Sequence, residues 1–169
     1  MALTSTITGY NDRWPTLFNQ EADRLRPLFG ETLVDLHHVG STAVVGLAAK
    51  PEIDILVVVN ATEDLDLWEG ALKQLGYRRG GDLSAGHHFF KRDVEGVRTH
   101  KLHVCLVGHP QISRMLKVRD HLRSNDKDRE AYKALKLQLE KESQTGIAEY
   151  LNGKAPFLDE LYQKVHSTE

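Results

Sequence analysis

The segment from residue 52 to residue 60, EIDILVVVN, constrains the fold more than any other stretch of the chain. It is rich in β-branched residues and almost continuously apolar, which is typical of a strand buried on both faces in a sheet. It nevertheless contains Glu52 and Asp54, and side chains two residues apart on a strand point to the same face. Because two buried carboxylates repel each other, we expect a divalent cation or a basic partner beside them. The alternative is that Glu52, which follows Pro51, lies at an exposed end of the strand.

Regular elements are expected on both sides of this strand. Apolar spacing predicts helices at residues 13–30, 61–76, 112–125, 126–143 and 155–166, the last with Pro156 near its start. Strands are expected at 31–40, 87–93 and 98–108, with a hairpin turn at 94–97 and a short helix of small residues at 41–50. This order predicts one α/β or α+β domain over residues 1–169, with a mixed β-sheet flanked by helices and a helical C-terminal layer from about residue 111.

Composition excludes several classes of protein. The chain has 169 residues, 40% of them hydrophobic, and a net charge of −2, so a nucleic acid or membrane partner would need a local patch. The single cysteine, Cys105, excludes a disulfide framework and a multi-cysteine zinc site, and we expect it to be a small core residue. The N-terminal sequence lacks a signal-peptide pattern, and no run of about 18 apolar residues occurs. We therefore expect a cytoplasmic protein with no membrane partner.

A Gly-Ser-Thr turn at residues 40–42 precedes the expected small-residue helix. The exposed N–H groups and the dipole at a helix N-terminus favour a phosphate group. Mg²⁺ is commonly bound by one or two carboxylates together with water and substrate phosphates, which suits Asp54 and Glu52. Turn and carboxylates together predict a site for a nucleoside triphosphate with Mg²⁺. The alternative is an ordinary turn beside a structural ion pair.

Four segments resemble the GrpB family, in the same order and with comparable spacing. They are YNDRWPTLFNQEADRLRPLFG, HVGSTAVVGLAAKPEIDILV, HHFFKR followed by RTHKLHV, and RDHLRSN with DREAYKALK, and they extend from Tyr10 to about Phe157. GrpB proteins are similar to the polymerase-beta-type nucleotidyltransferase superfamily, whose hallmark is a Gly-Ser before a helix, followed by a strand with an Asp-hydrophobic-acid pair. The resemblance therefore implies a nucleotidyltransferase-like fold. The family also occurs fused to dephospho-CoA kinase.

The resemblance also implies roles for individual residues. Gly40 and Ser41 match the phosphate-contacting turn, and Asp54 matches the first metal carboxylate. The second carboxylate would stand at position 56, where this chain has Leu56, so Glu52 is the auxiliary candidate. A third acid is expected on a later strand, where RTHKLHV offers Lys101 and His103 on one face and His100 on the other. We expect His103 to act as a metal ligand or as a general base.

Basic residues and histidines supply further candidates. Lys50, Lys91 and Arg98 could bind phosphates, although exposed cations are usually solvated. Residues 112–141 contain nine Lys and Arg against five Asp and Glu, which suits either an anionic ligand or a charged helical exterior. Six histidines fall on expected strands: His37, His38, His87, His88, His100 and His103. Without a standard metal-binding spacing, polar structural roles are favoured for them over a zinc site.

Three functions remain open from the sequence. The leading hypothesis is an enzyme that binds a nucleoside triphosphate with Mg²⁺ and transfers a nucleotidyl group to a small acceptor. The first alternative is a noncatalytic module that binds a nucleotide or a CoA-related ligand, favoured by Leu56 at the second carboxylate position. The second is an RNA-directed nucleotidyltransferase that uses the basic C-terminal helices, although the charge balance makes a nucleic acid partner the less favoured reading.

Overall fold

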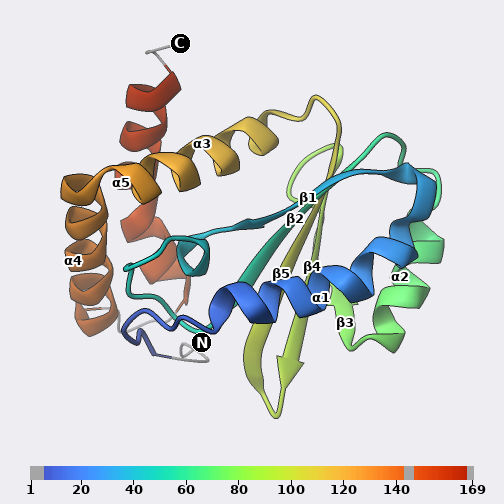
Figure 1. Cartoon of the computed structure of the whole chain (residues 1–169), viewed down its shortest axis with the longest axis horizontal. Coiled ribbons are helices and arrows are strands. Elements are labelled where there is room, and N and C mark those ends of the chain that lie inside the picture. Colours follow the sequence, from blue (N-terminus) through green and yellow to red (C-terminus); the bar gives the residue numbers. More distant parts are fainter. Residues whose placement is uncertain (1–5, 143–146, 167–169) are drawn as a thin grey trace.

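A five-stranded mixed sheet lies between two groups of helices in the computed structural model, which describes residues 6–142 and 147–166 (Figure 1). The helices are α1 (Trp14–Phe29), α2 (Leu65–Gln74), α3 (Pro110–Ser124), α4 (Asp126–Glu142) and α5 (Ile147–His166), with 3₁₀ turns η1 (Gly30–Thr32) and η2 (Ser41–Ala43). The strands are β1 (Leu33–Val39), β2 (Ile53–Val59), β3 (Tyr77–Arg79), β4 (His87–Val94) and β5 (Val97–Leu106). Their order across the sheet is β1-β2-β5-β4-β3. The predicted mixed sheet with flanking helices is confirmed.

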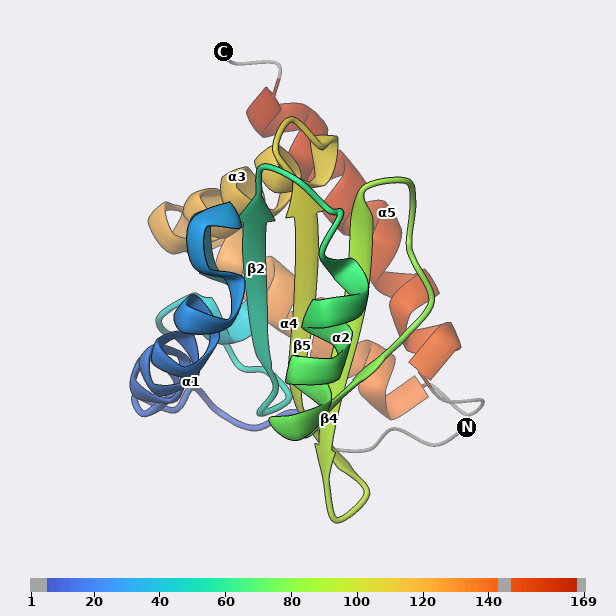
Figure 2. The ribbon, with the colours of Figure 1, turned by 90° about the vertical axis from the view of Figure 1, so that its right-hand side faces the viewer.

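Strand β2 is an interior strand, as its composition predicts. It pairs antiparallel with β1 and parallel with β5, and each of its side chains except Asp54 is buried. Ile53, Ile55, Val57 and Val59 belong to a core that also contains residues of α1 and α2. Leu56 and Val58 face the other way and pack against α3. Figure 2 shows this layering, with α1 and α2 in front of the sheet and α3, α4 and α5 behind it.

The C-terminal helices are anchored to the segment between β1 and β2. Val44 and Leu47 are fully buried in a second core with Leu122, Tyr132 and Leu161. This core joins the segment at residues 41–50 to α3, α4 and α5, so the helical layer covers one face of the sheet rather than forming a separate unit. No helix within 6–142 and 147–166 is long and apolar enough to cross a membrane.

Several predicted boundaries differ from the structure. The small helix expected at 41–50 is only the single 3₁₀ turn η2, because Gly46 adopts a φ of +86° that a helix cannot contain. The short strand β3 was not predicted, since three residues are too few to show an alternating pattern. Helix α5 begins at Ile147 and holds Pro156 in its interior, whereas Pro156 was expected near its start. The predicted end of the preceding helix, Ser143, lies outside the described residues.

Candidate functional site

The two carboxylates of the central segment meet a lysine from the neighbouring strand. Asp54 lies beside Lys101 in the parallel pairing of β2 and β5, and Glu52 immediately precedes β2. The Nζ atom of Lys101 is 3.3 Å from Glu52 Oε2 and 3.5 Å from Asp54 Oδ1. The charge of Asp54, more than that of Glu52, raises the pKa of Lys101 to about 12 despite its burial. A basic partner therefore compensates the carboxylates, which is one of the two outcomes that their burial predicts.

Gly40 lies against the carboxylate of Asp54. Its backbone has a φ of +74°, and a Cβ atom at this position would lie 2.2 Å from Asp54 Oδ2. A side chain here would therefore displace Asp54, which explains why the turn requires glycine. The turn and the carboxylate come together as predicted. The helix N-terminus expected after the turn is absent, because η2 spans only Ser41–Ala43 and supplies no helix dipole.

Two adjoining cavities open at this place. The larger, of about 210 Å³, is lined by Gly40, Ser41 and Asp54 and by residues of the C-terminal helices: Gln111, Arg114, Met115, Val118, Arg119, Leu122, Tyr132, Lys154 and Leu158. The smaller, of about 40 Å³, shares Ser41, Asp54 and Lys154 with it, and is also lined by Lys50, Glu52, Lys101, Lys136 and Tyr150. Ligand cavities that enclose a whole drug-sized molecule are usually larger, about 300–1,000 Å³. The site would thus hold part of a nucleotide-sized ligand and leave the rest exposed.

Lysines without a close anionic partner surround the smaller cavity. Lys136 is 2% exposed, and its Nζ lies 5.0 Å from the ring centre of Tyr132. No described carboxylate lies within ion-pair distance of Lys136 or Lys154. Burial, reinforced by the charge of Lys154, lowers the pKa of Lys136 to about 7. Burial, together with the charge of Lys101, lowers the pKa of Lys154 to about 8. Burial also lowers the pKa of Lys50, whose Nζ lies 4.3 Å from the ring centre of Tyr150.

Two arginines of α3, in the wall of the larger cavity or next to it, join this helix by hydrogen bonds to β1 and to the turn that follows β1. Arg119 lines the cavity and donates a hydrogen bond to the carbonyl oxygen of His38, at 3.1 Å. Arg123 donates to the carbonyl oxygen of Ala43, at 2.8 Å. Burial and these two guanidinium groups lower the pKa of His38 to about 4, so its imidazole is neutral at neutral pH. Asp120 offsets part of this positive charge, because it forms ion pairs with both Arg119 and Arg123.

The remaining predicted site residues lie away from the cavities. His103 is on the same face of β5 as Lys101, but its Nδ1 lies 2.9 Å from Nε2 of His87, and it lines neither cavity. Burial lowers the pKa of His103 to about 3, which makes it a weak proton acceptor at neutral pH. Lys91 pairs opposite Lys101 on β4 and also lines neither cavity. Arg98 forms an ion pair with Asp93 near the β4–β5 hairpin turn.

The structure thus brings together part of the predicted set and adds residues that were not in it. Gly40, Ser41, Lys50, Glu52 and Asp54 converge on the cavities. The additions are Lys101 as counter-ion, Lys136 and Lys154 as cations, Arg114 and Arg119 as wall residues, and Tyr132 and Tyr150 as aromatic neighbours. The basic excess of residues 112–141 is the one sequence signal that pointed to several of them.

The donor set fits one bound cation rather than two. Asp54 Oδ1 is buried, and its ion pair with Lys101 at 3.5 Å is too long for a well-formed hydrogen bond, so it could serve as a metal ligand if Lys101 moved aside. Mg²⁺ often takes one or two protein carboxylates and completes its shell with water and phosphate oxygens. The two other positions at which the resemblance implies acids hold Leu56, which is fully buried, and Lys101 or His103. No second cation has enough oxygen ligands here.

Comparison with known proteins places the chain in a family. The family model described as GrpB protein matches residues 4–164. A UPF0157 protein of Halalkalibacterium halodurans is 36% identical over 164 residues, which cover 96% of this chain and 83% of that protein. The crystal structure of the conserved protein GrpB from Enterococcus faecalis has a TM-score of 0.89 and 31% identity, and covers 96% of this chain and 98% of that chain.

Two more distant similarities concern named enzymes. The dephospho-CoA kinase of Mycobacterium tuberculosis is 24% identical over 176 residues, which cover 89% of this chain but 43% of that protein. The Cid1 poly(U) polymerase, in a mutant form bound to MgATP, has a TM-score of 0.51 at 14% identity and covers 79% of this chain and 46% of that chain. At this identity the likeness is one of fold alone. The chain belongs to the GrpB family and has a nucleotidyltransferase-like fold.

Proposed function

We propose that this chain binds a nucleoside triphosphate with Mg²⁺ and transfers a nucleotidyl group to a small acceptor. The observation that carries the proposal is a pair of lysines, the buried Lys136 and the half-buried Lys154, that line the smaller cavity with Asp54 and have no described carboxylate within ion-pair distance. Burying a cation without a partner is costly, and a bound polyphosphate would remove that cost. The fold likeness to a nucleotidyltransferase supports the same class of ligand.

Each group of residues has a task in this proposal. Lys50, Lys136 and Lys154 would hold phosphate oxygens in the smaller cavity, and Ser41 would contribute its hydroxyl group. The larger cavity would receive the remainder of the nucleotide between the Gly40 turn and α3. Asp54 would hold Mg²⁺ through Oδ1, in exchange for part of its ion pair with Lys101. When bound, the metal neutralises charge on the phosphates and favours in-line displacement.

A noncatalytic module that binds a CoA-related ligand is the second candidate. The similarity to a dephospho-CoA kinase favours it, because that alignment covers most of this chain. Phosphates of such a ligand would use the same lysines, while a single candidate metal carboxylate would leave transfer chemistry unsupported. Release of pyrophosphate separates the two candidates, since only the transferase produces it.

Calorimetric titration of the full chain tests binding. ATP, GTP, CTP and UTP are titrated with and without Mg²⁺ into the wild type, Asp54→Asn and Lys154→Met. Asp23→Asn is the matched control, because Asp23 is an exposed partner of Arg26 on α1 and lines neither cavity. We expect at least one nucleotide to bind, Lys154→Met to weaken it roughly tenfold, the size of one charged hydrogen bond, and Asp54→Asn to remove the Mg²⁺ dependence. Absence of binding to all four, or equal binding in every variant, refutes the proposal.

Pyrophosphate release tests catalysis. The wild type and Asp54→Asn are incubated with the nucleotide that binds and with either a pool of small metabolites or a short RNA. We expect release with the small metabolites and a loss of release in Asp54→Asn. Release that requires RNA would favour the RNA-directed alternative, and binding without release would favour the noncatalytic module.

A further inference from the structure

A second group of potential ligands lies further along β5 from Lys101, outside both cavities described above. We propose that His87, Cys105 and His109 form a binding site for a borderline-soft divalent cation, Zn²⁺ in the first instance. One imidazole or thiol ligand atom from each residue lies within 4.8 Å of the other two. This site is independent of the proposed nucleotide site, since none of the three residues lines either cavity.

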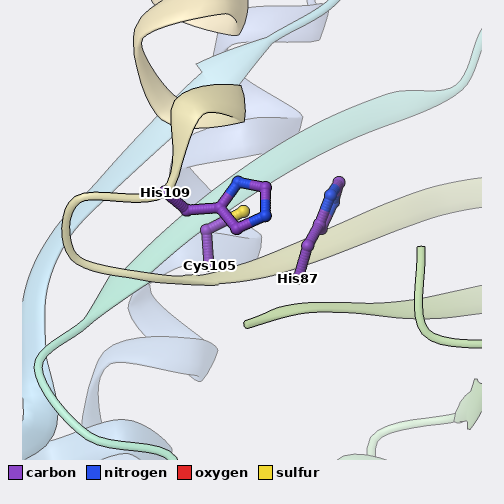
Figure 3. A group of neighbouring side chains, drawn as sticks. All are labelled: His87, Cys105 and His109. Atoms are coloured by element: carbon purple, nitrogen blue, oxygen red, sulfur yellow. The ribbon is translucent and has the colours of Figure 1, made fainter. Parts of the chain in front are cut away.

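Three separate pieces of backbone bring these side chains together. His87 is the first residue of β4 and lies directly opposite Cys105 in the antiparallel pairing with β5, so their side chains share a face. His109 comes back over that face because the chain turns at Gly108, whose φ is +89°, before α3 begins. Figure 3 shows the imidazole of His109 over the Cys105 thiol, with the ring of His87 beside them.

The spacing is close to that of a metal site. Ligand atoms on a tetrahedral zinc ion lie roughly 3.3–3.8 Å from one another, given bond lengths of about 2.0 Å to nitrogen and 2.3 Å to sulfur. A separation of at most 4.8 Å therefore has to shrink by about an ångström, which side-chain rotations can supply.

Hydrogen bonds to neighbouring groups determine which ring nitrogens a metal ion would take. The Nε2 atom of His87 lies 2.9 Å from Nδ1 of His103, which leaves Nδ1 of His87 for a metal and gives that ring an outer partner. The Nδ1 atom of His109 accepts from the Gln111 N–H, so the neutral ring carries its proton on Nε2, which lies 2.8 Å from Ser84 Oγ and donates to it. Binding a metal through Nε2 requires that proton to move to Nδ1, which gives up the cap hydrogen bond from Gln111, while water replaces His109 as the partner of the exposed Ser84 hydroxyl.

The chemistry of the three side chains selects the metal. The thiol of Cys105 must lose its proton when a metal binds, and burial raises its pKa to about 11, so binding should strengthen as pH rises. Thiolate and imidazole ligands select zinc-like metals over Mg²⁺ or Ca²⁺. Three protein ligands leave a fourth position for water, and the bound ion would join β4, β5 and the start of α3.

Direct metal binding tests this proposal. The full chain is treated with a chelator and then titrated with Zn²⁺ by calorimetry and with Co²⁺ by absorbance, because Co²⁺ bound to a thiolate gives a charge-transfer band. We expect one ion per chain, release of one thiol proton, and a band that disappears in Cys105→Ala. His109→Gln should weaken Zn²⁺ at least tenfold, whereas His37→Gln, a matched change on β1, should not. Ser84→Ala should tighten binding, since it removes the hydrogen-bond partner of the Nε2–H group of His109.

Two results would overturn the assignment. The first is the absence of a thiolate–Co²⁺ band in a well-folded wild type, and the second is a band that persists in Cys105→Ala. Circular dichroism and thermal unfolding of each metal-free variant show whether it is folded, and His109→Gln supplies the test if Cys105→Ala is not. Asp54→Asn should bind Zn²⁺ like the wild type, which separates this site from the proposed nucleotide site.

Discussion

Replacing Lys136 with methionine should stabilise the protein and weaken anion binding at the same time. Lys136 is 2% exposed, and its pKa falls from 10.5 to about 7. This shift corresponds to roughly 5 kcal/mol against the charged form, at about 1.4 kcal/mol per unit. Relaxation and loss of the contact with Tyr132 reduce the gain, so we expect Lys136→Met to be about 2 kcal/mol more stable than the wild type at pH 6.

The pH dependence has a defined sign. Above pH 10.5 lysine is neutral in both states, so Lys136 imposes no cost of charge burial. Between pH 10.5 and about 7 the unfolded chain holds a proton that the folded chain lacks, so wild-type stability decreases as pH decreases. The full cost remains below about pH 7. The stability advantage of Lys136→Met should thus be largest at pH 6 and shrink toward pH 10.

Chemical denaturation at pH 6, 8 and 10 measures the free energy of unfolding, and ATP titration measures binding. At pH 8, binding of ATP to the wild type should take up protons, because the phosphates raise the depressed pKa values of Lys136 and Lys154. Titration in buffers with different ionisation enthalpies counts those protons, and Lys136→Met should take up about one fewer if Lys136 is the group that titrates. Lys133→Met is the control on the same helix, since Lys133 lines neither cavity. A Lys136→Met protein that is less stable at pH 6 and binds ATP as the wild type does would refute the reasoning.

Three further perturbations are predicted from the same geometry. Gly40→Ala should destabilise the fold by roughly 2 kcal/mol, through its positive φ and the clash with Asp54; a double-mutant cycle with Asp54→Ala should recover part of the loss, and strictly additive effects would contradict the clash. Lys101→Met should cost roughly 3 kcal/mol, because it removes the ammonium group that pairs with both Glu52 and Asp54; thermal unfolding with Mg²⁺ should show a larger stabilisation than in the wild type. The free energy of unfolding should decrease as pH falls from 6.5 toward 4, because in this range His38 is protonated in the unfolded chain and neutral in the folded chain. The variant His38→Gln should show a weaker pH dependence in denaturation curves.

The fold was predictable where a pattern is local. The apolar run of β2 and the helical patterns of α1 and α2 can each be recognised within one short segment of sequence, and the structure confirms all three elements. Strand β3 is too short to show a period, and it exists because Tyr77–Arg79 pairs with β4. The predicted start of α5 was wrong because Pro156 lies inside the helix. A proline is common in the first turn of a helix and uncommon in its interior, so the sequence predicted a start close to Pro156.

The candidate site was predictable only in the part that comes from one continuous stretch. Gly40, Ser41 and Asp54 lie within one stretch of 15 residues, so a sequence motif is enough to identify all three. Lys136 and Lys154 reach the same place from α4 and α5, through the packing of Tyr132 and its neighbours on the segment after β1. A local basic excess cannot distinguish such a lysine from a solvated one, because the difference is burial, which depends on tertiary contacts.

The pairing of β2 with β5 sets the charge of the proposed nucleotide site. Parallel register puts residue 101 directly beside Asp54, at a place where the resemblance implies an acid nearby and this chain has Lys101. A third carboxylate there would add negative charge and favour a second metal ion, whereas the ammonium group of Lys101 offsets one of the two negative charges before a ligand binds. The positive charge of the other lysines is then left for the ligand. The site should accordingly bind a polyphosphate detectably without Mg²⁺, with the metal improving affinity rather than being required. ATP titration in the presence of a chelator measures this, and complete loss of binding there would show that Lys101 does not substitute for a metal ion.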